Sequence, residues 1–144
     1  MMIRRSAVII ILFFAACATQ NYGGIARTSD QMVKEAKASI REVSVDDVKK
    51  MIDNREKIII LDVRDRDEFE TGYIPGAINL SRGMLEFKIS TVVPDKKATI
   101  VVYCGVDLRG PLATKTLNEM GYQNTVNIIG GLKAWKAAGY PVVK

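Results

Sequence analysis

The amino-acid sequence predicts an α/β domain with a central parallel five-stranded sheet and helices on both faces. Apolar runs of strand length alternate with helical segments along the chain, and this order is typical of parallel sheets. The runs IIIL (58–61) and TIVVY (99–103) show no polar alternation, which indicates strands buried on both faces. A chain of 144 residues that is 48% hydrophobic suits one such domain.

The segments in the first half of the chain follow this alternation. Residues 28–40 have a Ser/Asp start and helical spacing, so they form a short helix or continue an N-terminal tether. Residues 41–43 form a short extended piece, and a helix capped near Ser44 follows. The apolar run 57–63 is the first buried strand, and residues 66–72 form a short helix that stops at a glycine.

The second half continues the same alternation of strands and helices. The helix over 110–121 has Pro111 near its first turn and Gly121 at its end, an arrangement that helices favour. The remaining segments are strands at 76–80, 98–104 and 125–129 and helices at 81–90 and 131–139.

The N-terminus has the build of a secretory signal peptide. Arg4 and Arg5 precede an apolar core, Ala7 to Ala16, that is shorter than the about 20 residues needed to span a bilayer. The sequence FAAC (14–17) resembles the lipobox of bacterial lipoproteins, in which the cysteine is lipidated and becomes the new N-terminus. The alternative is ordinary cleavage after Ala18.

The lipobox interpretation divides the chain into a signal peptide (1–16), a lipid-anchored tether with a short helix (17–39) and a folded domain (40–144). Cys17 is then the lipidation site. The protein is expected to be exported, as a bacterial membrane-anchored lipoprotein that faces the periplasm or the cell exterior and contacts the membrane through its N-terminal lipid. With Cys17 acylated, Cys104 has no disulfide partner, and a lone thiol in an exported protein is a candidate reactive group.

Two features of the composition exclude several kinds of function. The net charge of +5 falls to +3 without Arg4 and Arg5, since 19 Lys and Arg then oppose 16 Asp and Glu. The lysines are scattered through the predicted helices, which argues against a nucleic-acid partner. The chain contains no histidine, so Cys–His and Ser–His–Asp catalysis and most zinc sites are excluded.

Cys104 stands where the strand 98–104 ends and the next helix is about to begin. In sheets of this class, ligands bind beyond the carboxyl ends of the strands. Without histidine, a thiolate has to be stabilised electrostatically. The backbone N–H groups of the loop that follows, the helix start and the charge of Arg109 would favour a thiolate and bind an approaching anion.

Three segments together resemble the single-domain rhodanese (thiosulfate sulfurtransferase-like) family. LDVRDRDEFETGYIPGAINL (61–80) resembles the family's first signature. YCGVDLR (103–109) resembles its active-site loop, and GGLKAWKAAGYPV (130–142) resembles its closing signature. The resemblance covers residues 43–143 in the family's order, and it implies a rhodanese-like fold for residues 40–144.

The resemblance also implies a mechanism. Cys104 would take a sulfane sulfur from a small anionic donor such as thiosulfate, hold it as a persulfide and pass it to a thiol or cyanide-like acceptor. No metal and no cofactor is implied. Phosphatases that share the fold have one residue more than the four between Cys104 and Arg109, which favours sulfur chemistry. The residues expected to bind the donor are Gly105, Val106, Asp107, Leu108 and Arg109.

Two positions depart from the family pattern. Asp107 stands where many members have glycine; aspartate tolerates left-handed backbone, but its carboxylate would oppose an anionic donor. Asp107 therefore motivates an alternative function, a non-catalytic rhodanese-fold binding or persulfide-carrier module. It is also one possible partner for Arg109. Tyr73 replaces the histidine common in the first signature, which bears on the shape of the pocket.

The other prominent residues have structural interpretations. Asp62 and Arg64 are expected to form a structural ion pair near the site, since buried charges are normally paired. Trp135 is expected in the core. Arg82 and Glu86 either line the pocket mouth or occupy plain surface positions. The glycines expected at turns are Gly76, Gly130 and Gly131.

Overall fold

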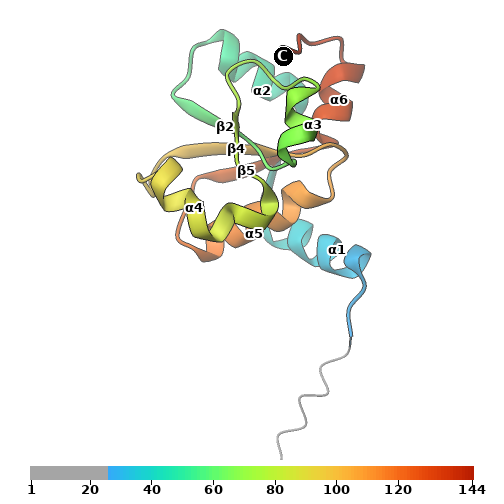
Figure 1. Ribbon diagram of the computed structural model, residues 1–144, viewed down its shortest axis with the longest axis vertical. Helices are drawn as coiled ribbons and strands as arrows, with labels where there is room; N and C mark the ends of the chain where they lie inside the picture. The colour runs from blue at the N-terminus through green and yellow to red at the C-terminus, as the bar shows by residue number, and fades with distance from the viewer. Residues whose placement is uncertain (1–25) are drawn as a thin grey trace, which may run out of the picture.

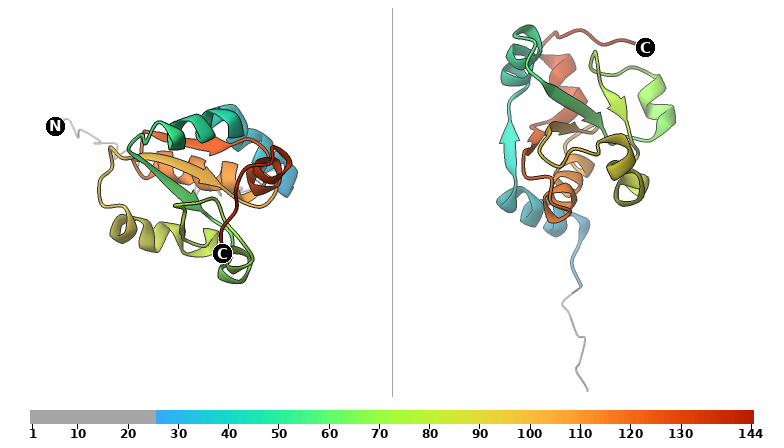
Figure 2. Two further views of the ribbon diagram at one scale, coloured as in Figure 1. Left: turned by 90° about the horizontal axis from the view of Figure 1, so that it is seen from above. Right: turned by 90° about the vertical axis from the view of Figure 1, so that its left-hand side faces the viewer.

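The computed structural model describes residues 26–144, which form a five-stranded sheet covered by helices on both faces (Figure 1, Figure 2). Every pairing within the sheet is parallel and the strand order is β1-β5-β4-β2-β3, which confirms the predicted fold class. The predicted signal peptide and Cys17 lie outside the described residues. The strands are β1 (Arg41–Val43), β2 (Ile58–Asp62), β3 (Ile78–Asn79), β4 (Thr99–Tyr103) and β5 (Thr125–Ile128).

The helices also follow the predicted order. Thr28 and Gln31 form a capping box at the start of the first helix, so residues 28–40 form a helix and do not continue a tether. The segment predicted as one helix over 81–90 is a 3-10 turn, η1 (Arg82–Met84), followed by a separate helix. No helix within residues 26–144 is long and apolar enough to cross a membrane. The helices are α1 (Ser29–Ser39), α2 (Val45–Asp53), α3 (Arg66–Glu70), α4 (Leu85–Val92), α5 (Arg109–Glu119) and α6 (Gly131–Ala137).

Side chains of the two central strands, β2 and β4, alternate between two cores. Leu61 and Val102 pack on the side covered by α4 and α5. Ile60 and Val101 pack on the other side with α2 and α6, where Trp135 is fully buried. Because both faces of each central strand meet helices, both sets of side chains are apolar, which explains the absence of polar alternation in the sequence.

A buried ion pair closes the carboxyl end of β2. Arg64 Nη2 lies 2.6 Å from Asp62 Oδ2, and the two residues are 4% and 0% exposed. The guanidinium also donates to the carbonyls of Glu68 and Gly72, each at 2.9 Å. Burial lowers the pKa of Arg64, but the hydrogen bonds and charge of Asp62 outweigh burial and raise that pKa above its usual value. Asp62 and Arg64 thus join β2 to the C-terminal end of α3 and the residues that follow it.

Replacing Asp62 by alanine would leave the Arg64 charge buried without its partner. We expect the Asp62→Ala change to lower the free energy of unfolding in urea by about 3–5 kcal/mol. The control is Asp67→Ala, which removes an exposed carboxylate of α3 and should cost less than about 1 kcal/mol. Equal losses for the two variants would contradict a special role for the buried pair.

Candidate active site

Cys104 follows β4 at the carboxyl edge of the sheet and is a free thiol that is 1% exposed. The Cys104 carbonyl accepts a hydrogen bond from the Leu132 N–H at 2.8 Å, and the Gly105 carbonyl accepts one from the Lys133 N–H at 3.0 Å. Both donors belong to the first turn of α6. The first two carbonyls after β4 are therefore bound by α6.

The loop between Cys104 and Arg109 keeps its backbone donors available. Within residues 26–144, the N–H groups of Gly105 to Leu108 donate to no protein acceptor. Helix α5 begins directly afterwards, and no side chain caps its first turn. Uncapped N–H groups and the helix dipole make this segment suitable for binding an anion.

Two glycines allow the loop to lie close to its neighbours. Gly131 adopts φ of +59°, and a Cβ at this position would clash with the carbonyl oxygen of Cys104. A Cβ on Gly110, in the first turn of α5, would clash with the side-chain oxygen of Asn127 on β5. The loop is therefore packed against α6 and β5 at positions where no side chain fits.

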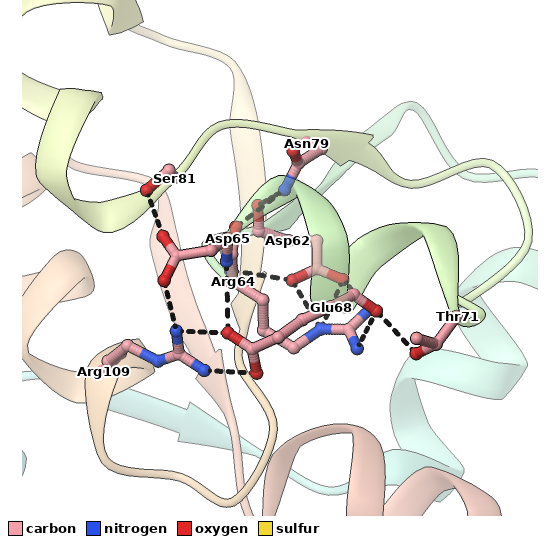
Figure 3. Close-up of polar contacts among 8 residues, drawn as sticks. All are labelled: Asp62, Arg64, Asp65, Glu68, Thr71, Asn79, Ser81 and Arg109. Carbon is pink, nitrogen blue, oxygen red and sulfur yellow. Dashed lines mark hydrogen bonds and ion pairs between the residues drawn. The ribbon is translucent and has the colours of Figure 1, made fainter.

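Arg109 forms a bidentate ion pair with Glu68 of α3 (Figure 3). Its two terminal nitrogens lie 2.6 and 2.7 Å from the Glu68 oxygens, and Asp65 is 3.5 Å away. The hydrogen bonds raise the pKa of Arg109 and lower the pKa of Glu68. The pair therefore stabilises the fold above the usual carboxyl pKa and loses this effect as the pH falls through the lowered pKa of Glu68. The ion-pair partner of Arg109 is Glu68 and not Asp107, which the sequence offered only as an alternative to anion binding.

Asp107 adopts φ of +68°, the left-handed backbone that the sequence allowed for it. Its carboxylate is occupied on both oxygens. Oδ2 lies 2.5 Å from Lys37 Nζ of α1, and Oδ1 accepts a hydrogen bond from Asn127 Nδ2 at 2.7 Å. The charge expected to oppose an anionic donor is thus balanced by a lysine.

An open hollow of about 320 Å³ lies against the loop. Gly105 and Val106 form the loop side of the hollow, and Leu132, Lys133 and Lys136 form the α6 side. Neither lysine makes an ion pair within residues 26–144. Two free cations beside an apolar floor suit an anionic molecule with an apolar part.

Residues 44–138 match the model of the rhodanese-like domain family. The chain belongs to this family. It is 38% identical over 73 residues to thiosulfate sulfurtransferase PspE of Escherichia coli (strain K12), covering 51% of this chain and 69% of PspE. It is 28% identical over 109 residues to YrkF of Bacillus subtilis (strain 168), covering 76% of this chain but only 58% of YrkF.

A solved structure also resembles this rhodanese-like domain. It is a protein of unknown function from Rhodopseudomonas palustris CGA009, described as a possible tyrosine phosphatase. The two chains superpose with a TM-score of 0.76 and 34% sequence identity, over 83% of this chain and 97% of the other.

Of the site residues expected from the sequence, Gly105 and Val106 line the hollow of the rhodanese-like domain, whereas Cys104, Asp107, Leu108 and Arg109 do not. Tyr73, Arg82 and Glu86 also lie outside its lining. The Tyr73 ring stacks on Phe69 with ring centroids 4.0 Å apart. Arg82 lies 2.8 Å from Glu86 and donates to the Thr116 hydroxyl at 3.0 Å. Arg82 and Glu86 therefore pair with each other beside α5 and do not line the hollow.

Sequence inspection missed the charged residues that balance the loop. Glu68 had a local signal, because it forms a capping box with Asp65 at the start of α3. Nothing local shows that Glu68 reaches Arg109, which is 41 positions away. Lys37 and the two lysines of α6 are indistinguishable in sequence from solvated helix faces. No cluster of His, Cys, Asp or Glu in residues 26–144 could hold a metal ion.

A methyl group at residue 131 should disrupt the loop of the rhodanese-like domain. Gly131→Ala adds both positive-φ strain and a clash with the Cys104 carbonyl. The matched control is Gly139→Ala, which has φ of +76° but nothing within 4 Å of the added methyl. We expect Gly131→Ala to lower the free energy of unfolding by about 1–3 kcal/mol more than the control does, because overpacking adds to strain. Equal losses of unfolding free energy for the two variants in urea would show that the loop rearranges around the added methyl group without a cost.

Proposed function

We propose that this rhodanese-like domain is a sulfurtransferase that carries sulfane sulfur as a persulfide on Cys104. The observation that supports this most directly is a free, buried thiol followed by four N–H groups that have no protein acceptor within residues 26–144. Such a loop stabilises an anion at the thiol. The chain has no histidine to activate water, which favours transfer over hydrolysis. The family and the activity named for PspE support thiosulfate as the donor.

The proposed reaction needs no outside oxidant. The Cys104 thiolate attacks the outer sulfur of thiosulfate, the S–S bond breaks, and its electron pair leaves with sulfite. The product is the Cys104 persulfide. A thiolate or cyanide then attacks the outer persulfide sulfur, forming the acceptor's persulfide or thiocyanate, and the Cys104 thiolate leaves. The N–H groups of the loop stabilise the negative charge of donor and persulfide.

Charged side chains tune the potential around this loop. Arg109 attracts the donor less than an unpaired arginine would, because Glu68 takes both of its terminal nitrogens. Lys133 and Lys136 add two unpaired charges in the hollow beside Gly105. We propose that the hollow admits the anionic donor and then the acceptor.

Two alternatives have weaker support. The Rhodopseudomonas palustris protein makes phosphatase activity a second candidate. However, the loop has four residues between Cys104 and Arg109, one fewer than the phosphatases that share the fold. Phosphate recognition also favours an arginine whose two terminal nitrogens are free to bind it. The reason to consider a non-catalytic carrier was the repulsion of an anionic donor by the Asp107 carboxylate. Pairing with Lys37 weakens that reason, because it offsets the negative charge.

Thiosulfate should add the mass of one sulfur atom to Cys104. We expect peptide mass spectrometry of the full chain to find this addition on the Cys104 peptide, a reductant to remove it, and Cys104→Ser to lack it. The wild type should also leave p-nitrophenyl phosphate intact. Hydrolysis of that ester, with no sulfur uptake from thiosulfate or other sulfane donors, would replace the proposed function by a phosphatase.

The Arg109–Glu68 pair should control donor affinity. Glu68→Gln removes the carboxylate that neutralises Arg109, so the KM for thiosulfate should fall about threefold or more. Arg109→Ala leaves Glu68 and Asp65 uncompensated and should raise the KM about tenfold or more. Steady-state thiosulfate-to-cyanide kinetics measure both changes. The control is Glu70→Gln, an exposed position on α3 paired with Arg66, which should leave the KM unchanged. A raised KM for Glu68→Gln would mean that Glu68 positions Arg109 more than it neutralises it.

We also propose that the protein is exported and anchored through a lipid on Cys17. The support is the sequence alone, namely the basic start, the short apolar core and the FAAC motif. Expressed with its leader in a bacterium, the protein should fractionate with membranes, and Cys17→Ala should release it or block its maturation. An intact mass for an unlipidated chain that starts at Thr19 would support ordinary cleavage instead.

A further inference from the structure

Helix α1 precedes the residues 44–138 that match the family model, yet it reaches the active-site loop. The helix packs along α5, with Ala36 fully buried (Figure 1). Lys37, near its end, places Nζ 2.5 Å from Asp107 Oδ2. A segment outside the matched family domain thus contacts a residue of the anion-binding loop.

Further contacts hold the Asp107 carboxylate from the sheet side. Asn127 of β5 donates to Asp107 Oδ1 at 2.7 Å and to Glu42 Oε1 of β1 at 2.9 Å. Lys37 Nζ also lies 3.5 Å from Glu42. Asn127 is 0% and Asp107 is 8% exposed. Lys37 of α1 and Asn127 of β5 thus bind the Asp107 carboxylate directly, and Glu42 of β1 contacts both of these partners.

Lys37 supplies the positive charge of this group, where it faces the two carboxylates of Asp107 and Glu42. The hydrogen bond from Lys37 to Asp107 raises the pKa of Lys37 although burial opposes it, so the lysine stays charged near neutral pH. Without Lys37, the carboxylates of Asp107 and Glu42 would stand uncompensated beside the loop. Their charge would repel an anionic donor and disfavour a thiolate at Cys104.

We propose that Lys37 is a positioning residue of the sulfurtransferase site, which neutralises Asp107 and so allows an aspartate to occupy a left-handed position in an anion-binding loop. Asp107 needs φ of +68°, a conformation that glycine adopts freely and aspartate tolerates. The consequence for donor affinity rests on the proposed function. The electrostatic effect on Cys104 does not depend on it.

The rates at which two alkylating reagents modify Cys104 report the electrostatic potential at the thiol and do not depend on sulfur transfer. Iodoacetate is an anion and iodoacetamide is neutral, so the ratio of their rates on the Cys104 peptide falls as the local potential becomes more negative. In the full chain, Lys37→Met should lower this ratio about tenfold, the effect of one unit charge roughly 10 Å away at an effective dielectric constant near 20. It should also raise the KM for thiosulfate more than it lowers kcat. The control is Lys34→Met, an exposed lysine on α1, which should leave the ratio unchanged.

The double variant Lys37→Met/Asp107→Gly separates charge from structure. If Lys37 acts by neutralising Asp107, removing both should restore the ratio to within about twofold of wild type. A ratio that stays low in a double variant with wild-type circular dichroism and unfolding free energy would overturn the proposal.

Asp107→Gly alone keeps the test decisive if Lys37→Met does not fold. It leaves Lys37 without its nearest carboxylate, so the ratio should rise above wild type, and an unchanged or lower ratio would overturn the proposal. If the ratios behave as expected while wild type takes no sulfur from thiosulfate, the proposed function fails and the role of Lys37 stands.

Discussion

The closure of the Cys104 loop onto α6 is the contact on which the rest of the site depends. N–H groups of Leu132 and Lys133 bind the carbonyls of Cys104 and Gly105. The N–H groups of Gly105 to Leu108 have no acceptor in the part of the chain that the structure describes. An anion site needs N–H donors and has to exclude carbonyl oxygens, so this closure decides the sign of the potential beside the thiol. It is possible only because residue 131 has no Cβ and adopts positive φ. A residue far from Cys104 in the chain thus shapes the loop directly.

The charged side chains around the loop are arranged as balanced pairs. Arg109 meets Glu68 at one end, and Asp107 meets Lys37 nearer the middle. Pairing holds these side chains in place but reduces the field that each exerts on a bound anion. Backbone N–H dipoles and the helix start add contributions that do not titrate. These backbone groups contribute positive potential beside Cys104 in a chain without histidine. Lys133 and Lys136, which make no ion pair within residues 26–144, add charge from the hollow.

The buried ion pair at the end of β2 supports this arrangement through α3. Arg64 is held by Asp62 and binds the carbonyl of Glu68, whose side chain in turn binds Arg109 (Figure 3). Asp65, at the start of the same helix, accepts a hydrogen bond from Ser81 at 2.6 Å and also lies near Arg109. Residues 61–80 therefore reach the Cys104 loop through one short helix, α3. Its charged residues serve the geometry of the loop as well as the stability of the fold.

The sequence by itself determined the fold class, the order of the elements and the position of Cys104 at the sheet edge. These depend on local patterns, such as unbroken apolar runs and helix caps, that act within a few residues. The tertiary structure decided which charges meet. Lys37 and Asp107 are 70 positions apart, and Glu68 and Arg109 are 41 apart. In sequence, Lys37 looks like any charge on a solvated helix face, and the capping box of Glu68 indicates a partner only in Asp65. Only the packing of α1 along α5 and the contact of α3 with the loop bring them to their partners, because ion pairing depends on distance in space and carries no signature along the chain.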